Sequence, residues 1–209
     1  MPGQEGARAP RTRERQRGGL ETGDLVLFSG RGLISAVLKH ASQSRWSHVG
    51  LVLRGAERNP ALLWESTALT RTPGLERGRP RRGVQLVPLG RRVRDYRGIV
   101  VLRRLLVRRS PAMDRALRRL RGELQDRPYE HDMVQLLRAA YEGPGGQNHQ
   151  DLRYLFCSEL VAEAYQAMGL LPPWPPSSEY TPRDFSSEAS ASLPLLRGAR
   201  LAPELLLKG

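Results

Sequence analysis

Short apolar runs separated by polar and glycine-rich segments dominate the first half of the chain, a pattern typical of β-strands and turns. The run at 25–28 follows a Gly-Asp turn and precedes a glycine-rich segment, so it predicts a buried strand. The runs at 46–53 and 62–66 flank a polar turn and predict a β-hairpin. Two further strands are predicted at 84–89 and 98–106.

Helical spacing of apolar residues appears in four places. We predict helices at 33–40, 110–124, 133–140 and 157–168. Ser110 and Pro111 form a helix-entry pair, and Gly169 is a stop signal. The predicted fold class is α+β: a small, largely antiparallel sheet with the helix that begins at Cys157 packed against it.

The chain has 209 residues and a formal net charge of +13, and this basicity is concentrated in one segment. Arg71 to Arg121 holds 17 basic and 3 acidic residues, a net of +14, which leaves −1 for the rest of the chain. This segment indicates an acidic substrate or an anionic surface as a partner. It has only Tyr96 for base stacking, so no obligate nucleic-acid partner is expected.

Composition also excludes several classes of protein. A single Cys excludes a disulfide scaffold and any cysteine-built zinc or iron–sulfur site. No run approaches the roughly 18 apolar residues that would span a bilayer, and the N-terminus lacks the apolar segment of a secretory peptide. We therefore expect a cytoplasmic protein with a disordered basic tail at 1–21 and one domain at 22–209.

Cys157 is the strongest candidate nucleophile. It stands at the first turn of its predicted helix, where unpaired N–H groups and the helix dipole stabilise a thiolate. It shares a stripe with Leu160, Val161, Ala164 and Met168, so its sulfur points toward the rest of the fold. Taken alone, such a residue is more often a small buried hydrophobe.

His48 and Glu65 form a candidate pair in the predicted hairpin. A turn centred between residues 57 and 58 pairs positions whose numbers sum to about 113, or to one or two away from it, and 48 and 65 sum to 113. Facing residues have Cβ atoms roughly 4.5–5.5 Å apart, so the carboxylate can orient the imidazole and stabilise its charged form. Each residue alone has a structural alternative, a half-buried histidine or a solvated carboxylate. A register slip of one residue would separate them.

The remaining titratable residues give weaker signals. His40, His131 and His149 form no metal-ligand spacing with each other or with Cys157, so neither a metal nor a cofactor is predicted. Asp24 most simply ends the turn before the first strand.

The segments TGDLVLF at 22–28, WSHVG at 46–50, WES at 64–66 and FCSELV at 156–161 resemble the circularly permuted papain-like cysteine hydrolases of the NlpC superfamily, particularly the YiiX-like and YaeF-like branch. In that branch the His and its polar partner precede the Cys, as they do here. The resemblance covers roughly residues 22 to 185. It implies a papain-like fold with Cys157 as nucleophile, His48 as base and Glu65 as the orienting third member.

The resemblance also extends to two flanking segments. Residues 127–130 resemble the family's Pro-Tyr segment, which implies that Tyr129 lies near the site and contacts substrate. Residues 180–185 resemble its downstream segment with Thr or Ser, Pro and Asp. A substrate-binding role for Asp24 is likewise implied only by the resemblance.

These features together predict a cysteine hydrolase, an amidase or peptidase, that forms a thioester acyl-enzyme. Its expected substrate is a small molecule, a peptide or a lipid amide. The alternatives are a lipid acyltransferase or thioesterase of the same superfamily, and a non-catalytic basic module that binds nucleic acid or an anionic membrane. The oligomeric state stays open.

Overall fold

The structure is a computed structural model that describes residues 19–32, 35–36, 39–40, 43–56, 60–67, 73–75, 83–124, 157–189 and 193–209. Most of the predicted tail at 1–21, the predicted helix at 133–140 and Tyr129 lie outside the described residues.

A six-stranded sheet in which all neighbouring strands are antiparallel forms the centre of the fold. Its strand order is β4-β3-β2-β1-β5-β8. The strands are β1 (Leu25–Gly30), β2 (His48–Arg54), β3 (Ala61–Thr67), β4 (Gly83–Pro88), β5 (Gly98–Arg103) and β8 (Leu205–Lys208). A separate ribbon pairs β6 (Leu105–Leu106) with β7 (Arg200–Leu201).

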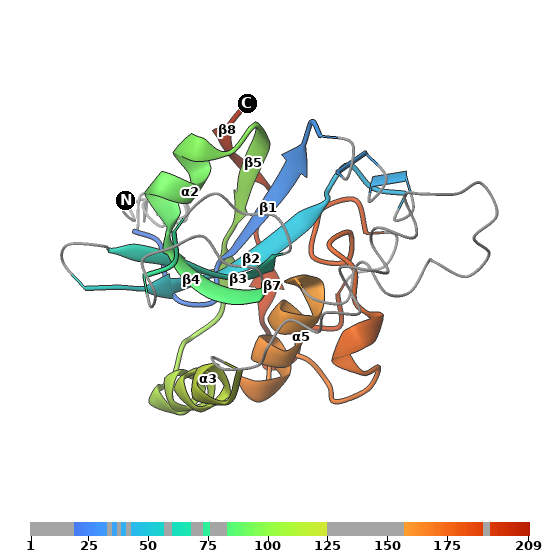
Figure 1. The fold of residues 1–209 in the computed structure, drawn as a ribbon. Helices are drawn as coiled ribbons and strands as arrows, with labels where there is room; N and C mark the ends of the chain where they lie inside the picture. The colour runs from blue at the N-terminus through green and yellow to red at the C-terminus, as the bar shows by residue number, and fades with distance from the viewer. Residues whose placement is uncertain are drawn as a thin grey trace, which may run out of the picture.

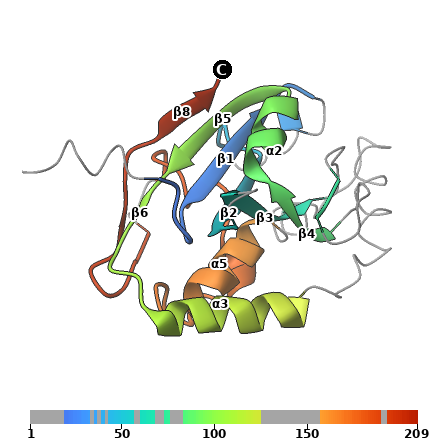
Figure 2. The ribbon, with the colours of Figure 1, turned by 90° about the vertical axis from the view of Figure 1, so that its left-hand side faces the viewer.

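Helices cover both faces of the sheet. Helices α2 (Leu89–Asp95), α3 (Pro111–Leu124), α5 (Cys157–Ala167) and the short 3₁₀ helix η2 (Ser177–Glu179) are described over their full length. Residues 35–36 and 39–40, within the helix predicted at 33–40, are helical as well. Helix α2 lies on one face, whereas α5 packs on the other against β2 and β3, with α3 beside it (Figures 1 and 2). This arrangement divides the core into two layers.

The apolar run of β1 is continuous because both faces of that strand are buried. Leu25 and Leu27 belong to the layer under α5, and Val26 and Phe28 belong to the layer under α2. The same alternation continues along β2, where Val49 and Leu51 face α5. His48 is therefore on the α2 side of the sheet, at the first position of its strand.

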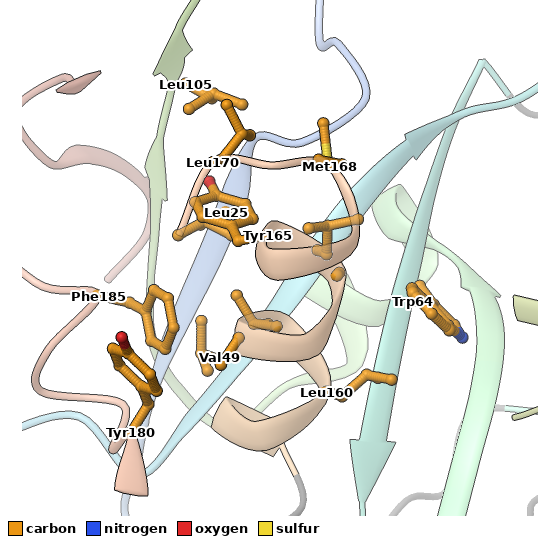
Figure 3. Packing of buried hydrophobic residues seen from close by; sticks show 14 of the residues in the cluster. Leu25, Val49, Trp64, Leu105, Leu160, Tyr165, Met168, Leu170, Tyr180 and Phe185 are labelled. Atoms are coloured by element: carbon orange, nitrogen blue, oxygen red, sulfur yellow. The ribbon is translucent and has the colours of Figure 1, made fainter. Parts of the chain in front are cut away.

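The layer around α5 fixes the position of that helix (Figure 3). Val49, Leu25 and Tyr165 belong to one buried cluster, and Leu160 lies on the side of the helix toward Trp64. The hydroxyl of Tyr165 donates a hydrogen bond to the Gly23 carbonyl at 2.8 Å, which ties the helix to the start of β1. Gly169 ends α5 with φ +66°, a conformation that glycine adopts without strain.

Most of the predicted elements are confirmed. The fold is α+β, the predicted hairpin is β2–β3, and the helix that begins at Cys157 packs on the sheet. The Ser110 hydroxyl accepts the Met113 N–H at 3.3 Å, in agreement with the predicted helix entry. The strand predicted at 98–106 was wrong in its extent, because it divides into β5 and β6. Helix α2 and strand β8 were not predicted.

Candidate functional site

The register of the β2–β3 hairpin brings His48 and Glu65 to the same face of the sheet. Facing residues on these strands, such as Leu51 and Trp64, have numbers that sum to 115. This sum lies within the one or two residues of 113 that the sequence allows, and a shift of two residues keeps both side chains on one face. They are diagonal neighbours, and their side chains still meet, with His48 Nε2 2.7 Å from Glu65 Oε2.

Glu65 is completely buried and is surrounded by hydrogen-bond donors. Gln85, which faces it on β4, donates from Nε2 to Oε1 at 2.8 Å. Arg92 Nε lies 2.9 Å from Oε1 and 3.2 Å from Oε2. With His48, these contacts hold both carboxylate oxygens, which is how a buried charge avoids a large desolvation cost.

Arg92, like Gln85, is a site residue that sequence reasoning missed. It comes from α2, and its side chain is only 8% exposed. Its guanidinium lies 5.1 Å from the Phe28 ring centroid and 5.2 Å from that of Tyr96. No local pattern predicts its burial, because Leu89 is the only other buried residue of α2 and the helix has too few apolar residues for a clear stripe.

Cys157 approaches the same imidazole from the other side of the sheet. The residue is buried at the first position of α5, and its sulfur shares a hydrogen bond with the His48 side chain. The backbone N–H groups of Val49 and Ser158 also donate to the sulfur. The contact is made at the end of β2, where His48 is the first residue of the strand.

The surroundings of these three groups favour their charged forms. Burial by itself would lower the pKa of His48, but the negative charge of Cys157 and the hydrogen bonds to Cys157 and Glu65 raise it to about 9. Burial would raise the pKa of the Cys157 thiol, but the charge of His48 and its hydrogen bond lower it. Burial would also raise the pKa of Glu65, yet the charge of Arg92 and the interactions with His48 lower it to about 2.

This arrangement has the chemical properties of an activated nucleophile. A thiol with a lowered pKa beside an imidazole with a raised one favours a thiolate–imidazolium pair near neutral pH. The buried carboxylate on the far nitrogen of the ring fixes its orientation. In the described part of the chain, no group of three or more His, Cys, Asp or Glu side chains could hold a metal ion.

Asp24, the weaker candidate, is placed elsewhere. It precedes β1, whereas His48 faces Phe28 four residues further along that strand, a separation of roughly 13 Å. Asp24 is buried and accepts hydrogen bonds from the Leu105 N–H at 2.9 Å and from Arg109 at 3.0 Å. These contacts join β1 to β6. The other predicted substrate-binding residue, Tyr129, lies outside the described residues.

Exposed arginines of the Arg-rich segment lie on both sides of the sheet. Arg91 and Arg94 are exposed on α2, and Arg115 and Arg118 are exposed on α3, which lies on the opposite side of the sheet (Figure 2). Three other arginines of the segment point into the fold. These are Arg92 in the site, Arg103 against the carbonyls of Phe185 and Ala202, and Arg109 against Asp24. An anionic partner for this segment stays a prediction.

Comparison with solved structures found several matching chains. The chain is similar to the crystal structure of the metalloprotein yiiX from Escherichia coli O157:H7. The TM-score is 0.46 and the sequence identity 21%, over 71% of this chain and 67% of that chain. No protein-family model and no curated protein matches the sequence.

Among the residues that the structure describes, no helix is both long enough and apolar enough to cross a membrane. The cytoplasmic location expected from the sequence stays a prediction.

Proposed function

We propose that this protein is a cysteine-dependent hydrolase that cleaves an amide bond, with Cys157 as nucleophile, His48 as general base and acid, and Glu65 as the residue that orients His48. One observation carries the proposal: Cys157, His48 and Glu65 form a chain in which His48 lies 2.7 Å from the buried carboxylate of Glu65, while its interaction with Cys157 raises the pKa of His48 and lowers that of the thiol. Three separate elements, α5, β2 and β3, supply these residues. Such a chain activates a nucleophile in unrelated folds.

In the acylation step, the Cys157 thiolate attacks the substrate carbonyl. A carbon–sulfur bond forms, and the carbonyl electron pair moves to oxygen. Backbone N–H groups at the start of α5 are the donors nearest to this oxyanion. When the tetrahedral species collapses, the carbon–nitrogen bond breaks and the His48 imidazolium gives its proton to the leaving amine. The product is a thioester acyl-enzyme.

In the deacylation step, neutral His48 accepts a proton from water. The resulting hydroxide attacks the thioester carbonyl, the carbon–sulfur bond breaks, and the acid product leaves. Cys157 is then a thiolate and His48 an imidazolium, as at the start. An alcohol or amine in place of water would give the acyltransferase alternative with the same residues.

We further propose that the fold belongs to the permuted papain-like branch of the NlpC superfamily. The support is the chain order His48, Glu65, Cys157 together with an antiparallel sheet on which the Cys helix packs. The four sequence segments that resemble this branch contribute β1, β2, β3 and the start of α5.

A panel of amide, ester and thioester substrates tests the proposed function. The expected result is turnover of at least one compound and, by mass spectrometry of the intact protein, an acyl adduct on Cys157. Cys157→Ala should abolish both, and His48→Ala should reduce turnover by about 10²-fold or more. His40→Ala, which changes an exposed histidine, is the matched control and should behave like the wild type. Turnover that survives Cys157→Ala would overturn the proposal.

A further inference from the structure

We propose that Arg92 is a positioning residue for this site: it holds Glu65 as a carboxylate, in one orientation, through the acidic pH range in which the enzyme would otherwise lose the partner of His48. This inference rests on the proposed function, because it assigns Arg92 a task only if His48 acts on Cys157.

The geometry of Glu65 supports this role. Its Oε2 accepts hydrogen bonds from His48 and Arg92, and its Oε1 accepts hydrogen bonds from Gln85 and Arg92. Arg92 is the one side chain among these that contacts both oxygens. These contacts fix the plane of the carboxylate, and any rotation about the terminal bond of Glu65 other than a half turn, which only exchanges the two oxygens, would weaken all four of them.

Arg92 itself is held in place by its neighbours. The rings of Phe28 and Tyr96 pack against its guanidinium, and Phe28 also contacts the His48 ring, with centroids 5.3 Å apart. The arginines on either side of it behave differently, since Arg91 is 51% and Arg94 is 76% exposed. Burial of a guanidinium is costly unless a carboxylate compensates it, so the position of Arg92 is explained by Glu65.

The charges of the site balance only when Arg92 is present. The titratable groups that face Glu65 from the described elements are His48 on β2, Arg92 on α2 and Tyr96 at the end of α2, with Cys157 of α5 behind His48. In the reactive form, Arg92 and His48 are positive and Glu65 and Cys157 are negative, and Tyr96 is neutral. Without Arg92 the buried site has a net charge of −1, which protonation of Glu65 relieves.

The electrostatics agree with this geometry. Burial of Glu65 raises its pKa, and the charge of Arg92 is the largest of the influences that lower it. Loss of that charge therefore moves protonation of Glu65 to higher pH. A protonated Glu65 no longer stabilises the His48 imidazolium, and the thiolate is lost with it.

The test compares Arg92→Met, Arg92→Lys and Arg91→Met. The rate of Cys157 alkylation by iodoacetamide is measured between pH 4 and pH 9, together with kcat/KM on any substrate found. We expect Arg92→Met to move the acid limb of both profiles up by about one pH unit or more, roughly a tenfold loss of rate on that limb. Arg92→Lys keeps the charge and should keep the limb. Arg91→Met, on the same helix, should match the wild type.

Several outcomes decide the inference separately from the proposed function. A shifted alkylation profile without turnover of any substrate would uphold Arg92 and overturn the hydrolase. Turnover with an unshifted limb in Arg92→Met would overturn Arg92 and uphold the hydrolase. If Arg92→Met does not fold, two other comparisons decide. A shift of the acid limb in Arg92→Lys would overturn the inference. The inference would also be overturned if the double variant Glu65→Gln/Arg92→Met shifts the acid limb further than Glu65→Gln alone.

Discussion

Replacing Glu65 by Gln changes a fully buried carboxylate into an amide of nearly the same shape. All groups that contact this carboxylate are donors: His48, Gln85 and Arg92. A carboxylate accepts at both oxygens, whereas an amide has one oxygen and one NH₂ group. In the variant, the NH₂ group must face a donor, and the guanidinium of Arg92 loses its counter-charge.

The expected loss of stability follows from this arrangement. Arg92 is 8% exposed, so the variant leaves a buried charge without compensation. Removal of one partner of a buried ion pair costs about 3–5 kcal/mol. For a chain of about this size each kcal/mol lowers the melting temperature by about 2–4 °C, so we expect Glu65→Gln to melt about 10 °C below the wild type.

Thermal unfolding at pH 7, followed by circular dichroism, is a suitable assay. Asp95→Asn provides a matched control, because Asp95 is 44% exposed and pairs with exposed Arg91 at 3.5 Å. Surface pairs of this kind contribute about 1 kcal/mol or less, so the control should melt within a few degrees of the wild type. Equal melting temperatures for Glu65→Gln and Asp95→Asn would refute the reasoning.

Three further predictions concern stability and the limits of the site. The folded-state pKa of Glu65 is about 2 against an ordinary 4.5. Its contribution of about 3 kcal/mol to the unfolding free energy is therefore present above pH 4.5 and is lost as the pH falls toward 2. In urea titrations at pH 3 to 6, the unfolding free energy of Glu65→Gln should depend less on pH than that of the wild type, and equal slopes would contradict this. Asp24→Asn should lower the unfolding free energy by about 1–3 kcal/mol, because it weakens the contacts to Leu105 and Arg109. It should leave the alkylation rate of Cys157 unchanged, and an altered rate would instead connect Asp24 to the site. Gly98→Ala should destabilise the fold by at least about 2 kcal/mol in the same urea assay. The reason is that Gly98 has a φ of +151° and that a Cβ there would lie 2.1 Å from the Ser29 carbonyl oxygen. Wild-type stability of this variant would argue against the tight pairing of β1 and β5.

The hairpin shows how far sequence reasoning reaches at the site. The apolar runs identify β2 and β3, and the observed pairing, with a sum of 115, lies at the edge of the range around 113 that the sequence predicts. His48 and Glu65 still meet because side chains repeat every two residues along a strand and because both are long enough to bridge a diagonal. The sequence therefore predicts that the two side chains share a face of the sheet, but it does not select one register within that range.

Helix α2 shows where such reasoning stops. Its sequence, LGRRVRD, has too few apolar residues for a clear helical stripe, so the pattern predicts that its arginines are exposed to solvent. The partner of Arg92 is Glu65, 27 residues earlier on another element, and no local pattern reveals that contact. Strand β8 was missed for a similar reason, since Leu205 pairs with Leu102 on β5.

The pH dependence of Cys157 alkylation in the wild type and in His48→Ala tests the central claim most directly. An isolated cysteine thiol has a pKa of about 8.5. If His48 and Cys157 form the thiolate–imidazolium pair, the wild-type rate should reach a plateau below that pH. His48→Ala, which leaves a buried thiol without its partner, should react only above it. Superimposable profiles for the two proteins would contradict the account.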